Sequence, residues 1–236
     1  MIVSLCAAMI GFTKTGVPGL GVLVIPLMAE VFPARASTGI VLPMLMFADI
    51  FAIAYYRRQV VWSHLLRIMP STIGGVVVGY LLLERVSDQQ LSPSIGIIVL
   101  IMLGLEQFRD RRVSDASVPT QWWFAGGLGL FAGTTTMLAN AAGPFMTIYL
   151  AAMRLQKSEF MGTNAWYYFV LNWVKVPFSL SLGLINSQSL QFDVSLFPAI
   201  AVSALAGAVI LKHMPQRKFE VVVQILAAAT AVKLIL

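Results

Sequence analysis

Charged residues are scarce in this chain. Only 11% of its 236 residues are Asp, Glu, Lys or Arg, whereas 58% are hydrophobic and the mean hydropathy is +0.84. No stretch is polar enough to form a soluble domain, so we expect one membrane domain over residues 1–236. The net charge of +6 does not indicate nucleic acid, because the basic residues stand in short loops between apolar segments. The expected partner is the lipid bilayer, and the charge bias is expected to set topology.

Metal-ligating and nucleophilic residues are equally sparse. Cys6 is the single cysteine, and His64 and His213 are the two histidines. This composition argues against a zinc or iron–sulfur site. Both histidines are expected near the cytoplasmic membrane boundary, so no Ser or Cys stands near a His within the membrane, and no GxxxxGKS/T loop is present. We therefore expect no cofactor and no ATP hydrolysis by this chain, with a membrane-embedded enzyme as the alternative class.

Apolar runs separated by polar residues predict an all-α polytopic protein. A helix needs about 20 residues to cross roughly 30 Å of hydrocarbon. Segments one, two, six and seven, with about 12 to 15 residues each, are too short to cross alone. The ten predicted segments are residues 2–13, 18–32, 36–56, 61–83, 90–108, 121–134, 141–153, 158–181, 191–211 and 217–236.

The basic residues predict how the short segments pair. Loops rich in Lys and Arg are expected to be cytoplasmic. If the loops after segments five and seven both lie there, segments six and seven form a hairpin of two half-helices. The same alternation makes segments one and two a hairpin that opens to the other face, which gives eight or so effective crossings. The basic residues used are Arg57, Arg58, Arg109, Arg111, Arg112, Arg154, Lys157, Lys212, Arg217 and Lys218.

A weak internal repeat supports this arrangement. Asp49 falls opposite Asn172 at an offset of 123 residues, and Gly79 falls opposite Gly207 at an offset of 128. Five segments per half is an odd number, so the second copy should be inverted relative to the first. We expect repeat one over residues 1–112 and repeat two over residues 121–236, which is typical of secondary transporters.

Two polar, glycine-containing stretches interrupt the short segments. "KTGVPG" provides Gly16 for a turn and Pro18 for the start of the next half-helix, and "TTTMLANAAGP" occupies the matching place in the second half. Two half-helix N-termini would then face one volume and favour an anion, with Lys14 adding a full positive charge. The alternative is that Gly and Pro are common in membrane helices and that Lys14 snorkels to an interface.

Three stretches resemble the TauE/SafE family of sulfite and organosulfonate exporters. They are "GFTKTGVPGLGVLVIPLMA", "YYRRQVVW" and "EFMGTNAWYYFVLNWVKVPFSLSLGLI". The resemblance covers essentially the whole chain. It implies a permease of the bacterial inner membrane that exports small anions such as sulfite or sulfoacetate, using an ion gradient. The family's glycine-rich stretch maps onto Gly16, Gly19 and Gly21, and its second copy onto Asn140, Gly143 and Pro144. "ANAAGP" has less glycine than the usual pattern, and a small carboxylate is the alternative substrate.

Segment eight and segment three carry further polar residues. Asn164, Tyr168, Asn172 and Lys175 share one helical face and are expected to line a cavity, or else to hold helices together. Asp49 in "FADIF" is expected to carry a proton or to pair with a buried lysine.

Together these patterns predict one site for a small anion and a coupling proton or other ion. No metal site is expected, and a homodimer is compatible with the sequence. Asp49 is the candidate ion-coupling residue. The candidate substrate-binding residues are Lys14, Thr15, Gly16, Gly19, Gly21, Thr135, Thr136, Asn140, Gly143, Asn164 and Lys175.

Overall fold

The computed structural model describes residues 2–15, 20–112, 122–210, 225, 227–229 and 231–235. These residues form nine numbered helices and a further helical piece near the C-terminus, without a strand among them, so the all-α prediction is confirmed over these ranges. The helices are α1 (Ile2–Thr15), α2 (Leu20–Val31), α3 (Ala34–Tyr56), α4 (Trp62–Arg85), α5 (Asp88–Arg112), α6 (Trp122–Ala139), α7 (Gly143–Ala152), α8 (Lys157–Ser181) and α9 (Ser187–Ile210).

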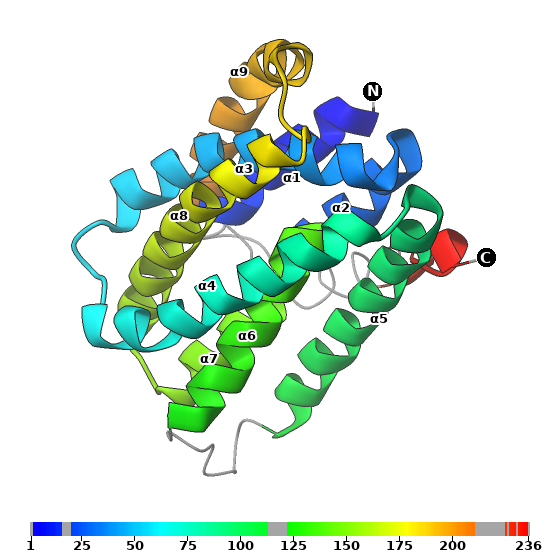
Figure 1. The fold of residues 1–236 in the computed structure, drawn as a ribbon. Coiled ribbons are helices and arrows are strands. Elements are labelled where there is room, and N and C mark those ends of the chain that lie inside the picture. Colours follow the sequence, from blue (N-terminus) through cyan, green and yellow to red (C-terminus); the bar gives the residue numbers. More distant parts are fainter. Residues whose placement is uncertain are drawn as a thin grey trace.

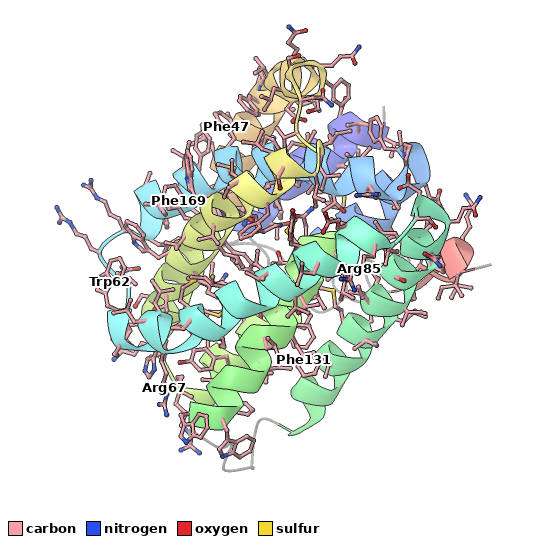
Figure 2. All side chains as sticks on the ribbon, in the orientation of Figure 1. Phe47, Trp62, Arg67, Arg85, Phe131 and Phe169 are labelled. Carbon is pink, nitrogen blue, oxygen red and sulfur yellow. The ribbon has the colours of Figure 1, made fainter. Side chains whose placement is uncertain are left out.

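The outer surface of the bundle is apolar along its length. Within the described residues, four helices have the length and apolar character needed to cross a membrane: α3, α4, the Asp88–Leu105 part of α5, and the Ser187–Gly207 part of α9. Large apolar side chains such as Leu66, Phe131 and Val202 point outward, whereas Arg67 and Arg85 mark the two ends of α4 (Figure 2). Such a surface suits a hydrocarbon solvent, so this is a membrane protein.

Three of the four segments expected to be short are short helices. α1 has 14 residues, α2 has 12 and α7 has 10, so each reaches at most about 21 Å at 1.5 Å per residue. The predicted end of segment six at residue 134 is wrong, because α6 continues to Ala139 and has 18 residues. The hydroxyls of Thr134 and Thr135 donate to the carbonyls of Leu130 and Phe131, one turn earlier, so these polar side chains find acceptors within the helix and do not mark its end.

In two pairs of helices, the partners pack against each other along much of their length. α1 lies along α9, and α4 lies along α6, at opposite sides of the molecule (Figure 1). Both pairs run parallel. Gly11 of α1 approaches Ser203 of α9, and further along both helices Thr15 approaches Gly207. In the other pair Gly129 of α6 approaches Ser71 of α4, and further along Met137 approaches Gly79.

α3 and α8 lie between these pairs and run antiparallel (Figure 1). Gly39 near the start of α3 approaches Leu184 just after α8, while Gly162 near the start of α8 approaches Gln59 just after α3. A Cβ at Gly39 would stand 2.1 Å from the Leu184 carbonyl oxygen, and one at Gly162 would stand 2.6 Å from the backbone of Gln59. α3 and α8 therefore lie along each other from end to end, and their midpoint lies between the two parallel helix pairs.

The described C-terminal residues pack against α5 (Figure 1). A Cβ at Gly96 of α5 would stand 2.5 Å from the Ala231 carbonyl oxygen. Lys233 also forms an exposed ion pair with Glu30 of α2, at 3.0 Å. Most of predicted segment ten, including Arg217 and Lys218, lies outside the described residues, as do Lys212 and His213.

Candidate functional site

A buried ion pair occupies the middle of the α3–α8 crossing. Asp49 of α3 is fully buried and its Oδ1 lies 2.6 Å from Lys14 Nζ at the end of α1. Its Oδ2 accepts a hydrogen bond from Asn172 Nδ2 of α8 at 2.7 Å. A buried charge is costly unless it is paired and hydrogen-bonded. Asp49 has the ion pair at Oδ1 and the hydrogen bond at Oδ2, whereas Oδ1 makes no further hydrogen bond.

Lys14 has a second favourable contact. Its Nζ lies 4.3 Å from the centre of the Tyr168 ring, a distance at which a cation is attracted to the π face. The Lys14 side chain is 12% exposed, whereas the side chain of Asp49 is 0% exposed. The cation therefore stands at the more open side of the pair.

The second helix break is built around Asn140. The backbone of Asn140 adopts φ of 55°, a left-handed conformation that Asn tolerates better than most residues and that ends α6. Asn140 Nδ2 donates to the Thr38 carbonyl of α3 at 3.0 Å, and Thr38 Oγ1 donates to the Leu138 carbonyl at 2.9 Å. α3 thus fixes the chain where α6 and α7 meet.

Lys175 of α8 reaches into this second break. Its Nζ donates to Asn140 Oδ1 at 2.5 Å and to Thr136 Oγ1 at 3.4 Å. The residue is fully buried, and both of these partners are neutral. It does not snorkel to an interface. A buried ammonium beside neutral partners is the type of group that attracts an anion.

The two breaks share one electrostatic environment. Lys14 and Asp49 lie close enough to Lys175 for their charges to act on it. Two lysines and one aspartate leave one positive charge in excess when all three are ionised. α7 begins at Gly143, just beyond Asn140, so the free N–H groups of its first turn add positive potential at the second break.

A family model described as "Sulfite exporter TauE/SafE" matches residues 3–234, nearly the whole chain. The chain belongs to this family. TauE/SafE proteins are membrane permeases that export sulfite and organosulfonates, and they are transporters rather than enzymes. The resemblance seen in the three sequence stretches is thereby confirmed. No curated protein and no solved structure matches the chain.

The structure brings together some of the candidate residues of this TauE/SafE protein. Lys14, Asp49, Asn140, Thr136 and Lys175 form the polar cluster described above. Tyr168 and Asn172, on the predicted polar face of α8, also belong to it. A Cβ added at Gly143 would lie 3.8 Å from the Tyr168 hydroxyl oxygen, so this hydroxyl lies near Gly143.

Other candidates point away from the cluster or lie apart from it. Thr15 Oγ1 donates to the Ala204 carbonyl of α9 at 2.5 Å. Thr135 Oγ1 donates to the Ala141 carbonyl at 2.9 Å and so bridges the second break. Asn164 lies roughly two turns before Asn172 on α8, and its buried Oδ1 has no hydrogen-bond partner.

The first break is described only up to its edges. A Cβ at Gly21, near the start of α2, would have Thr13 Cγ2 at 3.8 Å as its neighbour. Gly16 and Gly19, two further candidates, lie outside the described residues together with Pro18.

Sequence reasoning missed two polar residues. Thr38 holds the second break in place, and its spacing of three helical turns from Asp49 on the same face of α3 was an available signal. Asp193 of α9 is fully buried, and neither of its carboxyl oxygens has a hydrogen-bond partner. It stands two residues inside the predicted edge of segment nine, so it was not recognised as an intramembrane acid.

Proposed function

We propose that this protein is a secondary transporter that exports sulfite or a small organosulfonate across the bacterial inner membrane, coupled to protons through Asp49. The observation that carries the proposal is the pair of lysines at two helix breaks on either side of one buried acid. Family membership supports the same substrate class. A soluble anion would lose its water in this cluster and gain two ammonium groups and the N–H groups of a half-helix in exchange.

The proposal includes two inverted repeats that interlock. Gly39 and Gly162 differ by the predicted offset of 123, and each approaches the end of the other repeat's long helix. Asp49 and Asn172 differ by the same offset and bond to each other. Residues related by a two-fold axis meet where that axis passes, so this contact supports an axis through the middle of the α3–α8 crossing.

The parallel helix pairs support the same symmetry. Gly79 approaches Thr134 and Met137 of α6, and Gly207 approaches Phe12 and Thr15 of α1. The two glycines are 128 positions apart in the sequence. The neighbours that correspond to each other, Phe12 with Thr134 and Thr15 with Met137, are both 122 positions apart. The pairs α1–α9 and α4–α6 thus correspond with the repeats exchanged, as a two-fold axis requires.

The proposed multi-pass topology agrees with the observed helix directions. If α9 runs from outside to the cytoplasm, its parallel neighbour α1 enters from outside. If α4 runs outward, its parallel neighbour α6 enters from the cytoplasm. Two hairpins that open to opposite faces require these two directions.

Single cysteines test this topology, after Cys6 has been replaced by Ala. Cysteines at Ser114 and Gln156 should react with an impermeant maleimide only from the cytoplasm, and one at Ser187 only from outside. Gln156 and Ser187 are exposed, while Ser114 belongs to the part of the chain outside the described residues. Labelling of Ser114 and Gln156 from opposite faces would refute the second hairpin and the inverted repeat.

The anion site is tested by transport in proteoliposomes and by binding of sulfite to purified protein. Lys14→Gln and Lys175→Gln should each weaken binding by roughly tenfold to a hundredfold, which corresponds to about 1.5 to 3 kcal/mol for a hydrogen bond to a charged group. Lys233→Gln is the matched control, because Lys233 pairs with Glu30 at the surface and its side chain is 73% exposed. It should bind and transport as the parent does.

Folded Lys14→Gln and Lys175→Gln proteins that retain parental affinity would remove both lysines from the site. A parent protein that binds no sulfite, sulfonate or carboxylate would refute the proposed function as a whole.

A further inference from the structure

We propose that Asp49 is the resident counter-ion of the site, and that a doubly charged anion binds together with one proton whereas a singly charged anion binds without one. The inference rests on the proposed function and specifies the charge of its substrate.

The first step is the sum of charges. The site contains two lysines and one aspartate, which is one excess positive charge when all are ionised. A monoanion brings this sum to zero. A dianion brings it to minus one, and a proton on Asp49 restores zero. Because uncompensated charge in a buried site is costly, the proton is expected to follow the dianion.

The second step is competition for Lys14. In this structure Asp49 Oδ1 occupies the position 2.6 Å from Lys14 Nζ that an anionic oxygen would take. A protonated Asp49 would hold Lys14 less strongly and would keep its hydrogen-bonding contact with Asn172. Lys14 would not lose its place, because the Tyr168 ring supports the ammonium from another direction. The lysine is therefore free to change partners.

The third step concerns the other groups that face Asp49. From α1 this is Lys14, and from α8 these are Asn172 and, at longer range, Lys175. Of the charged side chains that the structure describes on the remaining neighbours, Glu30 of α2 pairs with Lys233, and Asp88 of α5 accepts a hydrogen bond from the Arg35 amide at the start of α3. The side chains of residues 106–112 of α5 lie outside those described.

The last two neighbours of α3 contribute no charge to Asp49. The sequence of α6 has no titratable side chain. On α9, Asp193 stands roughly four turns from Gly207, which is the level of Thr15. Asp49 is thus the acid that senses the anion, and Lys175 is the competing proton carrier.

The test counts protons during binding. Sulfoacetate is a dianion near neutral pH, and isethionate is a monoanion of similar size with a hydroxymethyl group in place of the carboxylate. Calorimetric titration of the purified protein with each probe, in buffers of different ionisation enthalpy, gives the number of protons taken up. We expect about one proton per sulfoacetate and about none per isethionate. This comparison needs no mutant.

Asp49→Asn then identifies the carrier, because it keeps the shape of the side chain. It should abolish proton uptake with sulfoacetate and should make its affinity independent of pH. Lys233→Gln, at the surface, is the control variant and should leave the proton uptake unchanged. Equal proton uptake for both probes, or uptake that persists in Asp49→Asn and disappears in Lys175→Gln, would overturn the inference while leaving anion transport standing. Failure of every anion to bind would refute the proposed function, and the inference with it.

Discussion

The two helix breaks differ in how their positive charge is balanced. At the first break the lysine comes from the broken helix itself, and Lys14 faces the carboxylate of Asp49. At the second break the lysine comes from a neighbouring helix, and Lys175 faces the neutral side chains of Asn140 and Thr136. One break therefore holds a lysine paired with an acid, and the other holds a lysine whose hydrogen-bond partners are neutral.

Under the proposed function, the two breaks would have different tasks. Lys175, when protonated, would attract the anion, and the Lys14–Asp49 pair would open in response to substrate and proton. At each break a lysine lies near the C-terminal end of a helix, α1 or α6, where the helix dipole also stabilises a cation. The dipole explains why lysines are tolerated there, and the acid explains why only one break is electrically neutral.

The largest effect is expected from removal of the acid at the first break. Asp49→Ala should lower the free energy of unfolding by about 3 to 5 kcal/mol, because it leaves Lys14 and Asn172 without their buried partner. Asp49→Asn is the isosteric control and should lose less stability, since its amide can still form hydrogen bonds with Asn172. Thermal and denaturant unfolding in detergent measure both variants. Parental stability of Asp49→Ala would show that the Tyr168 ring alone suffices for Lys14.

A smaller loss is expected at the second break. Asn140→Gly removes the acceptor of Lys175 and the donor to Thr38, and should cost about 1.5 to 3 kcal/mol, the range for a hydrogen bond to a charged group. Glycine accepts φ of 55° without strain, so this variant isolates the side chain. Asn140→Ala should cost roughly 1 to 2 kcal/mol more, because alanine resists the left-handed conformation. Equal unfolding midpoints for the two variants would mean that this conformation stores no strain.

The sequence was most informative where a residue conflicts with its surroundings. Asp49 is an acid inside an apolar span, and from that alone it was expected either to pair with a lysine or to carry a proton; the pairing with Lys14 is confirmed. Asn172 and Lys175 were expected on one face of their helix because their spacing is helical, and the structure places both in the buried cluster. Such conflicts are visible without tertiary structure because lipid imposes a strong cost on each polar group.

The sequence was less informative where the partner is a backbone group. Thr135 and Thr15 are candidate substrate-binding residues by sequence, but in the structure their hydroxyls donate to the carbonyls of Ala141 and Ala204. Threonine commonly bonds a carbonyl one turn earlier, as Thr135 also does with Phe131, so a run of threonines does not by itself mark the end of a helix. The contact of Thr38 with Asn140 joins residues far apart in the chain, and no local pattern specifies it.

The smallest effects are expected from exchange of each lysine for arginine. These exchanges test whether the two lysine side chains differ in how tightly they are packed, as well as in the charge of their partners. Lys14 is 12% exposed and already faces a carboxylate and an aromatic ring, both of which suit a guanidinium. Lys14→Arg should therefore change the free energy of unfolding by less than about 1 kcal/mol. Lys175 is fully buried against neutral partners, so the larger arginine must displace its neighbours. Lys175→Arg should cost about 1 to 3 kcal/mol, the usual cost of an overpacked core. Unfolding in detergent compares the two variants directly, with the charge unchanged in both. If Lys14→Arg loses more stability than Lys175→Arg, the first break is the tighter one, and the view of Lys14 as the lysine that is free to change partners is wrong.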